Sequence, residues 1–216
     1  MNSDRHSVTE KIDLHTDPDA VARLEAENGI RQFKTAVEIV KDHIHDPEKP
    51  FTLGTRHILL LNDEALKGIH PLAGTFRNTA VTISKSDHQP PEHYLVPDYV
   101  REVCDYVNNN WKEKGAIHLA AFVLWKLNWI HPFADGNGRT SRIIMYLVLN
   151  IKLQTILAGT PTIPEQISED KTPYYNALEA ADKAHKEGKL DLTDLENMLE
   201  SMLAKQLINA VKQAAS

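Results

Sequence analysis

The twelve-residue stretch HPFADGNGRTSR, at positions 131–142, constrains the fold of this chain more than any other feature. It separates two strongly apolar runs, GAIHLAAFVLWKLNWI before it and IIMYLVLNIKLQTIL after it, which we expect to be helices. Pro132 cannot continue the first helix, so the chain has to turn there. We expect the next helix to begin around positions 138–141. The stretch is therefore predicted as a short loop that places Gly136, Asn137 and Gly138 at the N-terminus of a buried helix.

The residue types of this loop suit a ligand that carries several phosphates. Free backbone N–H groups and the positive end of the helix dipole form an anion site, and glycine lets the backbone approach closely. Arg139 and Arg142 lie three positions apart, nearly on one face of the helix. Guanidinium groups bind phosphate through paired hydrogen bonds. One phosphate hardly needs two arginines and a cluster of N–H groups, so the pattern favours a polyphosphate.

Two further residues of the loop indicate group transfer. Asp135 offers a hard oxygen ligand, and Mg²⁺ commonly takes one carboxylate together with waters and substrate phosphates. His131 can accept a proton near neutral pH. The set fits phosphoryl or nucleotidyl transfer, in which His131 deprotonates an incoming hydroxyl. Each residue alone is more often structural, and the chemistry rests on their coincidence within twelve positions.

Two familiar phosphate-binding motifs do not account for this site. The sequence contains neither a Walker A motif nor a kinase-type glycine loop. The folds that those motifs mark are therefore excluded as its source.

The rest of the chain predicts an all-α fold with a small β-hairpin. The polar residues 1–16 are expected to be a loosely ordered tail. Asp17-Pro18 predicts a helix start, followed by one helix or by two that meet at Asn28-Gly29. Val81 and Ile83 alternate with polar residues in a stretch bounded by glycine and proline, which is typical of a short strand or hairpin.

Composition narrows the classes of partner. With 216 residues, 42% of them hydrophobic, the chain suits one globular domain. A net charge of −6 argues against nucleic acid or an anionic membrane as the main partner. The apolar runs are too short to span a bilayer, and the N-terminus has no apolar signal region. With a single cysteine, Cys104, these features lead us to expect a cytoplasmic protein. Apolar faces on the terminal helices would allow a homodimer.

The loop resembles the signature of Fic domains, H-P-F-x-[D/E]-G-N-G-R-x-x-R, at every specified position. The resemblance extends upstream to KGIHPLAGTFRNTAVTISKSDHQPP and downstream to TPYYNALEAADKAHKEG, and so covers roughly residues 55–190. Residues 17–54 are then a helical extension before this core, and residues 191–216 a C-terminal helix after it. The resemblance implies a mostly helical Fic fold. It also implies transfer of AMP from ATP to a Ser, Thr or Tyr hydroxyl of a target protein, or of the chain itself, with release of pyrophosphate.

The resemblance also implies a role for each residue of the site. His131 would be the general base, and Asp135 would hold Mg²⁺ between the α- and β-phosphates. The remaining nucleotide-binding positions would be Gly136, Asn137 and Gly138 as the anion hole, Arg139 and Arg142 on the β- and γ-phosphates, and Tyr175 and Asp182 beside adenine. A flap would hold the target by main-chain pairing. The flap residues are Thr82, Ile83, Ser84, Lys85, Ser86 and Asp87.

Many Fic proteins carry an inhibitory helix with the pattern [S/T]-x-x-x-E-[G/N], whose glutamate pairs with the last arginine of the signature. Glu27-Asn28 fits this pattern upstream of the core, with Arg23 in place of Ser or Thr, and its partner would be Arg142. A second match, at Glu196-Asn197, has Leu192 in that place. The alternative is that Glu27 is a solvated helical residue next to a helix stop.

The resemblance leaves other functions open. The same fold could transfer UMP, phosphate or phosphocholine, or remove AMP from a modified protein. A non-catalytic nucleotide-binding module is a further alternative. The presence of His131 argues against such a module, because a module without catalysis has no need of the base.

Overall fold

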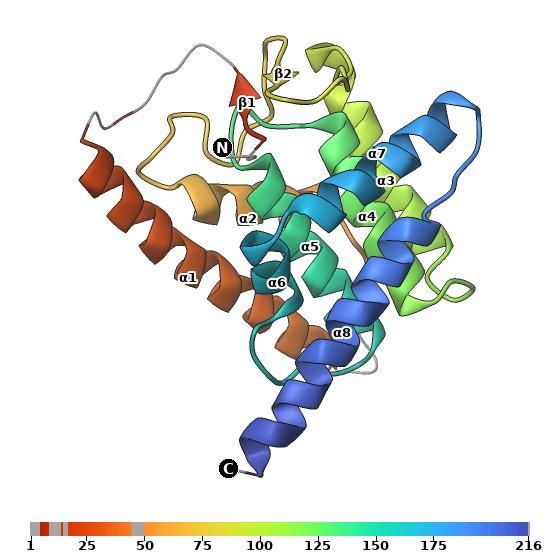
Figure 1. Cartoon of the computed structure of the whole chain (residues 1–216). Helices are drawn as coiled ribbons and strands as arrows, with labels where there is room; N and C mark the ends of the chain where they lie inside the picture. Colours follow the sequence, from red (N-terminus) through yellow and green to blue (C-terminus); the bar gives the residue numbers. More distant parts are fainter. Residues whose placement is uncertain (1–4, 9–13, 15–16, 45–49, 216) are drawn as a thin grey trace.

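The computed structural model describes residues 5–8, 14, 17–44 and 50–215. In these residues the chain forms eight α-helices, one 3-10 turn and two short strands (Figure 1), so the all-α class is confirmed. The helices are α1 (Pro18–Ile44), α2 (Thr55–Leu66), α3 (Val96–Asn109), α4 (Ala116–Ile130), α5 (Asn137–Lys152), α6 (Ile163–Glu169), α7 (Thr172–Lys186) and α8 (Thr193–Ala214). The 3-10 turn is η1 (His93–Leu95), and the strands are β1 (Ser7–Val8) and β2 (Thr82–Ile83).

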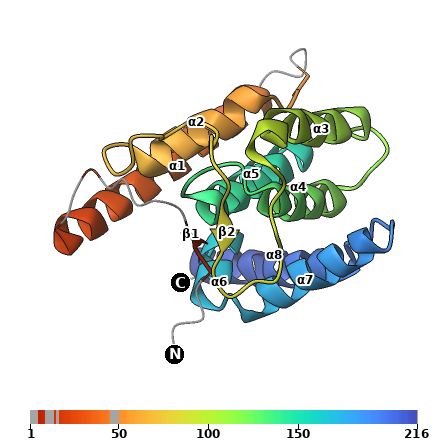
Figure 2. The same cartoon turned by 90° about the horizontal axis from the view of Figure 1, so that it is seen from above.

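Helices α4 and α5 form the centre of the molecule. Figure 2 shows α1 and α2 on one side of this pair and α7 and α8 on the other. From Ile143 to Ile151 every residue of α5 is buried, and α4 is buried over most of its length. A helix that is apolar on nearly all faces is stable only when neighbours cover it on every side. The two apolar runs therefore fix the core, and the loop between them lies where the central helices meet.

Helix α1 continues through Asn28-Gly29 without a break, so the prediction of a single helix is correct. Asn28 is buried, and its Nδ2 donates to the carbonyl of Lys67 at 2.8 Å and to that of Ala65 at 3.3 Å. The last carbonyls of a helix lack partners within the helix, and Asn28 supplies a donor to the end of α2. The Asn-Gly pair thus joins two helices here instead of stopping one.

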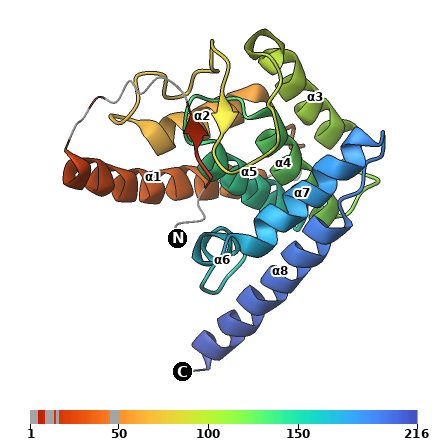
Figure 3. The ribbon, with the colours of Figure 1, turned by 45° about the horizontal axis from the view of Figure 1, so that its top comes forward.

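The flap differs from the predicted hairpin. Its strand β2 pairs antiparallel with β1, with Ser7 opposite Ile83 and Val8 opposite Thr82. The predicted β element therefore stands at the expected place, but its partner strand comes from the N-terminal residues (Figures 1 and 3). A single strand leaves its backbone groups unpaired, and an N-terminal segment can satisfy them. The rest of the predicted tail, residues 1–4, 9–13 and 15–16, lies outside the described residues.

Candidate active site

The loop between α4 and α5 turns at the predicted place. His131 ends α4 with its backbone N–H donating to the Leu127 carbonyl at 3.0 Å. Its φ of 51° lies in the left-handed region, which residues other than glycine adopt rarely and mostly where function requires it. This conformation stops the helix and turns the chain, so that the loop can approach the flap.

Buried Arg77 holds this turn from the opposite side. Its Nε donates to the carbonyl of His131 at 2.8 Å, and its Nη1 donates to the carbonyl of Thr79 at 3.0 Å. Its backbone N–H donates to the Pro132 carbonyl at 2.9 Å. Burial lowers the pKa of Arg77. Arg77 could not be predicted from the sequence, because a lone arginine in GTFRNT has no periodic or motif signal. It ties the loop between α4 and α5 to the base of the flap.

The His131 ring is buried and faces the hydroxyl of Ser7. Its Nε2 lies 2.9 Å from Ser7 Oγ. Burial lowers the pKa of His131 to about 3, although the Asn128 carbonyl partly offsets this effect. The imidazole is therefore neutral at physiological pH, the form in which it can accept a proton.

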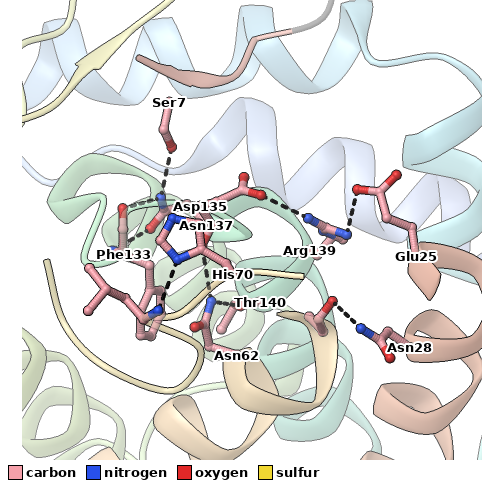
Figure 4. A network of polar contacts seen from close by, with 12 residues as sticks. Ser7, Glu25, Asn28, Asn62, His70, Phe133, Asp135, Asn137, Arg139 and Thr140 are labelled. Atoms are coloured by element: carbon pink, nitrogen blue, oxygen red, sulfur yellow. Dashed lines mark hydrogen bonds and ion pairs between the residues drawn. The ribbon is translucent and has the colours of Figure 1, made fainter. Parts of the chain in front are cut away.

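Two asparagines shape the loop from within. The Asn137 side chain accepts the Phe133 N–H at 2.9 Å and donates to the Phe133 carbonyl at 2.8 Å. Beneath the loop, Asn62 Nδ2 donates to the carbonyl of Asp135 and to Thr140 Oγ1, both at 3.2 Å (Figure 4). The Asn137 side chain thus braces the loop whose backbone the sequence predicts as an anion hole. Asn62, which sequence analysis did not single out, braces the same loop.

Gly136 is required at the start of α5 for two reasons. Its φ is 75°, in the left-handed region that favours glycine. A Cβ at this position would also lie 3.0 Å from Asn62 Nδ2 and 3.2 Å from Leu66 Cδ1. The glycine therefore lets the loop pack tightly against α2.

Arg139 lies between two carboxylates. Its Nη2 is 3.2 Å from Asp135 Oδ2, and its Nη1 is 3.1 Å from Glu25 Oε1 on α1 (Figure 4). About half of the side-chain surface of Asp135 is exposed, at 46%. The predicted phosphate-binding arginine and the predicted cation ligand thus contact one another. An anionic ligand with its cation would have to replace this contact.

The predicted residues surround one cavity of about 170 Å³. Those that line it are His131, Asp135, Gly136, Asn137, Gly138, Arg139, Arg142, Tyr175, Asp182 and the flap residues Ile83 and Ser86. The structure therefore brings the signature, the flap and α7 together. The other predicted flap residues, Thr82, Ser84, Lys85 and Asp87, do not line the cavity, and Arg5, His6 and Ser7, which sequence analysis did not predict, do.

The two residues predicted beside adenine are already in contact with other groups. Tyr175 is half-buried, with the Arg5 guanidinium 4.4 Å from its ring centroid, and its hydroxyl accepts the Arg5 backbone N–H at 3.1 Å. Asp182 Oδ1 accepts from the Trp125 indole at 2.8 Å, and its Oδ2 lies 3.9 Å from His88 Nδ1. Another planar group could replace the Arg5 guanidinium on the face of Tyr175. Asp182, in contrast, is held by its hydrogen bond to the buried Trp125.

The comparison with protein families identifies the stretch that contains this loop. The Fic/DOC family model matches residues 51–149, which include the whole loop and the flap. This stretch is a Fic domain. The resemblance of the loop to Fic domains is therefore confirmed.

Curated relatives of this Fic domain are named as protein adenylyltransferases. Protein adenylyltransferase Fic of Nematostella vectensis is 34% identical over 126 residues, which are 57% of this chain and 27% of that protein. A probable protein adenylyltransferase of Aquifex aeolicus is 29% identical over 122 residues, 56% of this chain and 38% of that protein. The chain spans about a quarter of the length of the first and under two fifths of the second.

Solved structures confirm the helical Fic fold. Fic-1 of Caenorhabditis elegans superposes with a TM-score of 0.65 at 22% identity, covering 88% of this chain and 52% of that one. A Fic-domain signaling protein of Bacteroides thetaiotaomicron gives 0.63 at 24% identity, covering 89% and 74%. BepC of Bartonella tribocorum, solved with bound AMPPNP, gives 0.57 at 18% identity, covering 87% and 88%.

The glutamates of the two possible inhibitory patterns lie apart from the cavity lining. Glu27 is exposed on α1, and within the described residues neither it nor Glu196 lines the cavity. Glu196 Oε1 lies 2.7 Å from His118 Nδ1 on α4. Glu25, two positions before Glu27 on α1, contacts the signature through Arg139. The inhibitory role of Glu27 stays a prediction.

Two further kinds of site, a ready-made metal cluster and a membrane-spanning helix, are not found among the described residues. No group of three or more His, Cys, Asp or Glu side chains is placed to hold a metal ion within them. Among the described helices, none combines the length and apolarity needed to cross a membrane.

Proposed function

We propose that this Fic domain transfers AMP from ATP to a protein hydroxyl and releases pyrophosphate. The observation that carries the proposal is the Ser7 hydroxyl, 2.9 Å from His131 Nε2 and beside the loop that starts α5. A hydroxyl, an imidazole and the N-terminus of a helix thus line one cavity, which supports transfer to a hydroxyl. The names of the relatives and the AMPPNP bound to BepC support the choice of an adenine nucleotide.

The phosphates would bind at the N-terminus of α5. The first N–H groups of a helix have no partner within the helix and attract anions. Arg139 and Arg142 border the same cavity. Phosphate oxygens would take the place of the Asp135 and Glu25 carboxylates on Arg139, because arginine binds both kinds of anion through the same fork of N–H donors. Tyr175 would then contact the adenine ring.

Asp135 fits a magnesium ion held mainly by the nucleotide. Mg²⁺ is usually bound by one or two carboxylates plus phosphates and waters, and does not require a cage of protein ligands. Asp135 is a half-exposed carboxylate next to the predicted phosphate site, which matches that donor set. When bound there, the ion would neutralise charge on the phosphates.

His131 would accept the proton of the acceptor hydroxyl. Because burial lowers the pKa of His131 to about 3, the ring is neutral at neutral pH. In the tautomer that carries its proton on Nδ1, Nε2 can accept the proton of the hydroxyl. The hydroxyl oxygen would bond to the α-phosphorus as the bond to the bridging oxygen breaks. Pyrophosphate would leave with that electron pair. Arg77 would keep the backbone of His131 in position during the reaction.

The target would be an extended segment that carries Ser, Thr or Tyr. The strand β2 offers a backbone edge beside the base, and β1 uses that edge in this structure. Recognition through main-chain hydrogen bonds depends little on the side chains of the target. The flap would therefore present an acceptor hydroxyl to His131.

The test compares ATP labelled at the α-phosphate with ATP labelled at the γ-phosphate. The chain is incubated with each and Mg²⁺, in a mixture of cell proteins, and label is followed on every protein including the chain. We expect transfer of the α-label alone, its loss in His131→Ala, and its retention in the matched control His118→Ala, whose histidine contacts Glu196 away from the cavity. Transfer of the γ-label alone, or equal labelling by His131→Ala, would contradict the proposal.

A further inference from the structure

The described N-terminal residues occupy the place at the flap where a target segment is expected. Beyond the pairing of β1 with β2, the Ser84 N–H donates to the His6 carbonyl at 2.9 Å, and the His6 N–H donates to the Ser84 hydroxyl at 3.0 Å. An extended segment added to a strand edge by main-chain bonds is a common mode of peptide recognition. Residues 5–8 are thus bound to the flap in the manner of a peptide ligand (Figure 3).

The Ser7 hydroxyl lies between the imidazole of His131 and the amide of Asn137. Its oxygen lies 2.9 Å from His131 Nε2 and 3.2 Å from Asn137 Nδ2. An amide nitrogen can only donate, so Ser7 Oγ accepts from Asn137, and its own proton can be donated to Nε2 in the His131 tautomer that is protonated on Nδ1. The separation of oxygen and base falls within the range for general-base catalysis, about 2.6–3.2 Å. Figure 4 shows the hydroxyl pointing at Asn137. The nearby Ser84 hydroxyl is instead bonded to His6.

Arg5 covers the surface that the nucleotide would need. Its guanidinium lies 4.4 Å from the Tyr175 ring centroid and pairs with Glu179, and its backbone N–H binds the Tyr175 hydroxyl. With Arg5 and Ser7 among its lining residues, the cavity measures about 170 Å³. Pockets for small molecules are usually about 300–1,000 Å³. ATP would therefore compete with the side chain of Arg5 for the face of Tyr175.

We propose that Ser7 is an acceptor of AMP within the same chain, an inference that rests on the proposed function. In the transfer, Arg5 leaves the face of Tyr175 to adenine while Ser7 stays on the flap. Ser7 Oγ bonds to the α-phosphorus of ATP, and its proton passes to His131 Nε2. The bond from that phosphorus to the bridging oxygen breaks, and pyrophosphate leaves with the electron pair. The product is a phosphodiester between Ser7 and AMP.

The experiment maps label on the purified full chain. Wild type, Ser7→Ala, Ser7→Thr, Arg5→Ala and the matched control Ser201→Ala are incubated with α-labelled ATP and Mg²⁺, then digested and analysed by peptide mass spectrometry. Ser201 is exposed on α8 and does not line the cavity. We expect AMP on residue 7 of wild type and Ser201→Ala, loss of that label in Ser7→Ala, and partial retention in Ser7→Thr. Arg5→Ala should be labelled about fivefold faster at low ATP, because a stacked cation–π contact no longer competes.

A second series asks whether the acceptor belongs to the same molecule. The rate constant of labelling at Ser7 should not change with protein concentration. A tagged His131→Ala chain, which keeps Ser7, should stay unlabelled when mixed with Ser7→Ala. Labelling of that tagged chain, or a rate constant that rises with concentration, would overturn transfer within one chain.

The outcomes separate this inference from the proposed function. AMP on other residues or on other proteins, with none on Ser7, would overturn the inference and leave the function standing. Equal labelling of Ser7→Ala and wild type would do the same. If no protein gains AMP and calorimetry detects no ATP binding, the proposed function fails, and this inference fails with it.

Discussion

At the scale of single residues, the structure adds to the signature the groups that hold it in place. Arg77 and Asn62 are such groups, because each holds a backbone carbonyl of the loop through its side chain. The contact of Arg139 with Asp135 follows from their spacing of four on the chain, whereas its contact with Glu25 depends on the placement of α1.

Arg77 is predicted to be a positioning residue. In Arg77→Ala the buried carbonyl of His131 loses its donor, and a buried group left without a partner costs about 1–3 kcal/mol. We therefore expect urea unfolding to show a loss of about 1–3 kcal/mol. Arg77→Lys, which keeps the charge but not the fork of donors, should recover part of the stability and little of the transfer. Full transfer by Arg77→Lys would show that the charge alone matters.

The buried histidine His131 predicts a pH dependence of stability. Burial lowers its pKa from 6.5 to about 3, so below pH 6.5 the unfolded chain binds a proton that the folded chain does not. Stability is thus complete above pH 6.5 and falls progressively toward pH 3. At pH 5 the loss from this one group is about 2 kcal/mol.

Urea unfolding at pH 7 and pH 5 checks this prediction. His131→Gln should lose less stability than wild type between the two values. His57, whose pKa burial lowers to about 4, gives a matched comparison, and His57→Gln should flatten the profile in the same direction. An unchanged pH dependence in His131→Gln would contradict the assignment.

At the scale of elements, the long helices and the short strand β2 were predictable, whereas α6 and β1 were not. Helices α4, α5, α7 and α8 have apolar patterns long enough to identify them from sequence. Helix α6 was missed, although Thr162 and Glu165 form a capping box at its start. Its seven residues are too few to show a helical period in the sequence. Strand β1 was missed because two residues of a polar segment have no pattern, and its pairing is decided by the flap.

Helix α1 is predicted to limit nucleotide binding through Glu25. Its carboxylate holds Arg139, and a partly exposed ion pair of this kind contributes about 0–1 kcal/mol. Glu25→Gln should therefore raise ATP affinity, by up to about fivefold, in isothermal titration calorimetry. Glu27→Gln makes the same charge change two positions away and is the matched comparison. A larger rise at Glu27 than at Glu25 would instead assign the inhibitory role to Glu27, as the family pattern predicts.

At the scale of the whole molecule, the site is assembled from segments distant in the sequence around a deeply buried helix pair. Residues 5–8, the flap, the loop that starts α5 and the first turns of α7 meet at one end of α4 and α5 (Figure 3). The loop and the flap could be placed together from sequence, because the family resemblance covers both. The contribution of residues 5–8 could not, since it arises from contacts across more than a hundred positions, such as Ser7 with His131.

This arrangement predicts two levels of local stability, which hydrogen exchange can measure. Amides of α4 and α5 should exchange only on global unfolding, because both helices are buried on most sides. The Arg5 amide donates to the Tyr175 hydroxyl, and the Ser84 amide donates to the His6 carbonyl. Both amides should exchange much faster. A non-hydrolysable ATP analogue should then change the protection of only one of them. The Arg5 amide loses protection as adenine takes the face of Tyr175, while the Ser84 amide keeps its bond to His6. Loss of protection at both amides would mean that the nucleotide displaces the whole segment, and Ser7 would no longer be held at the base.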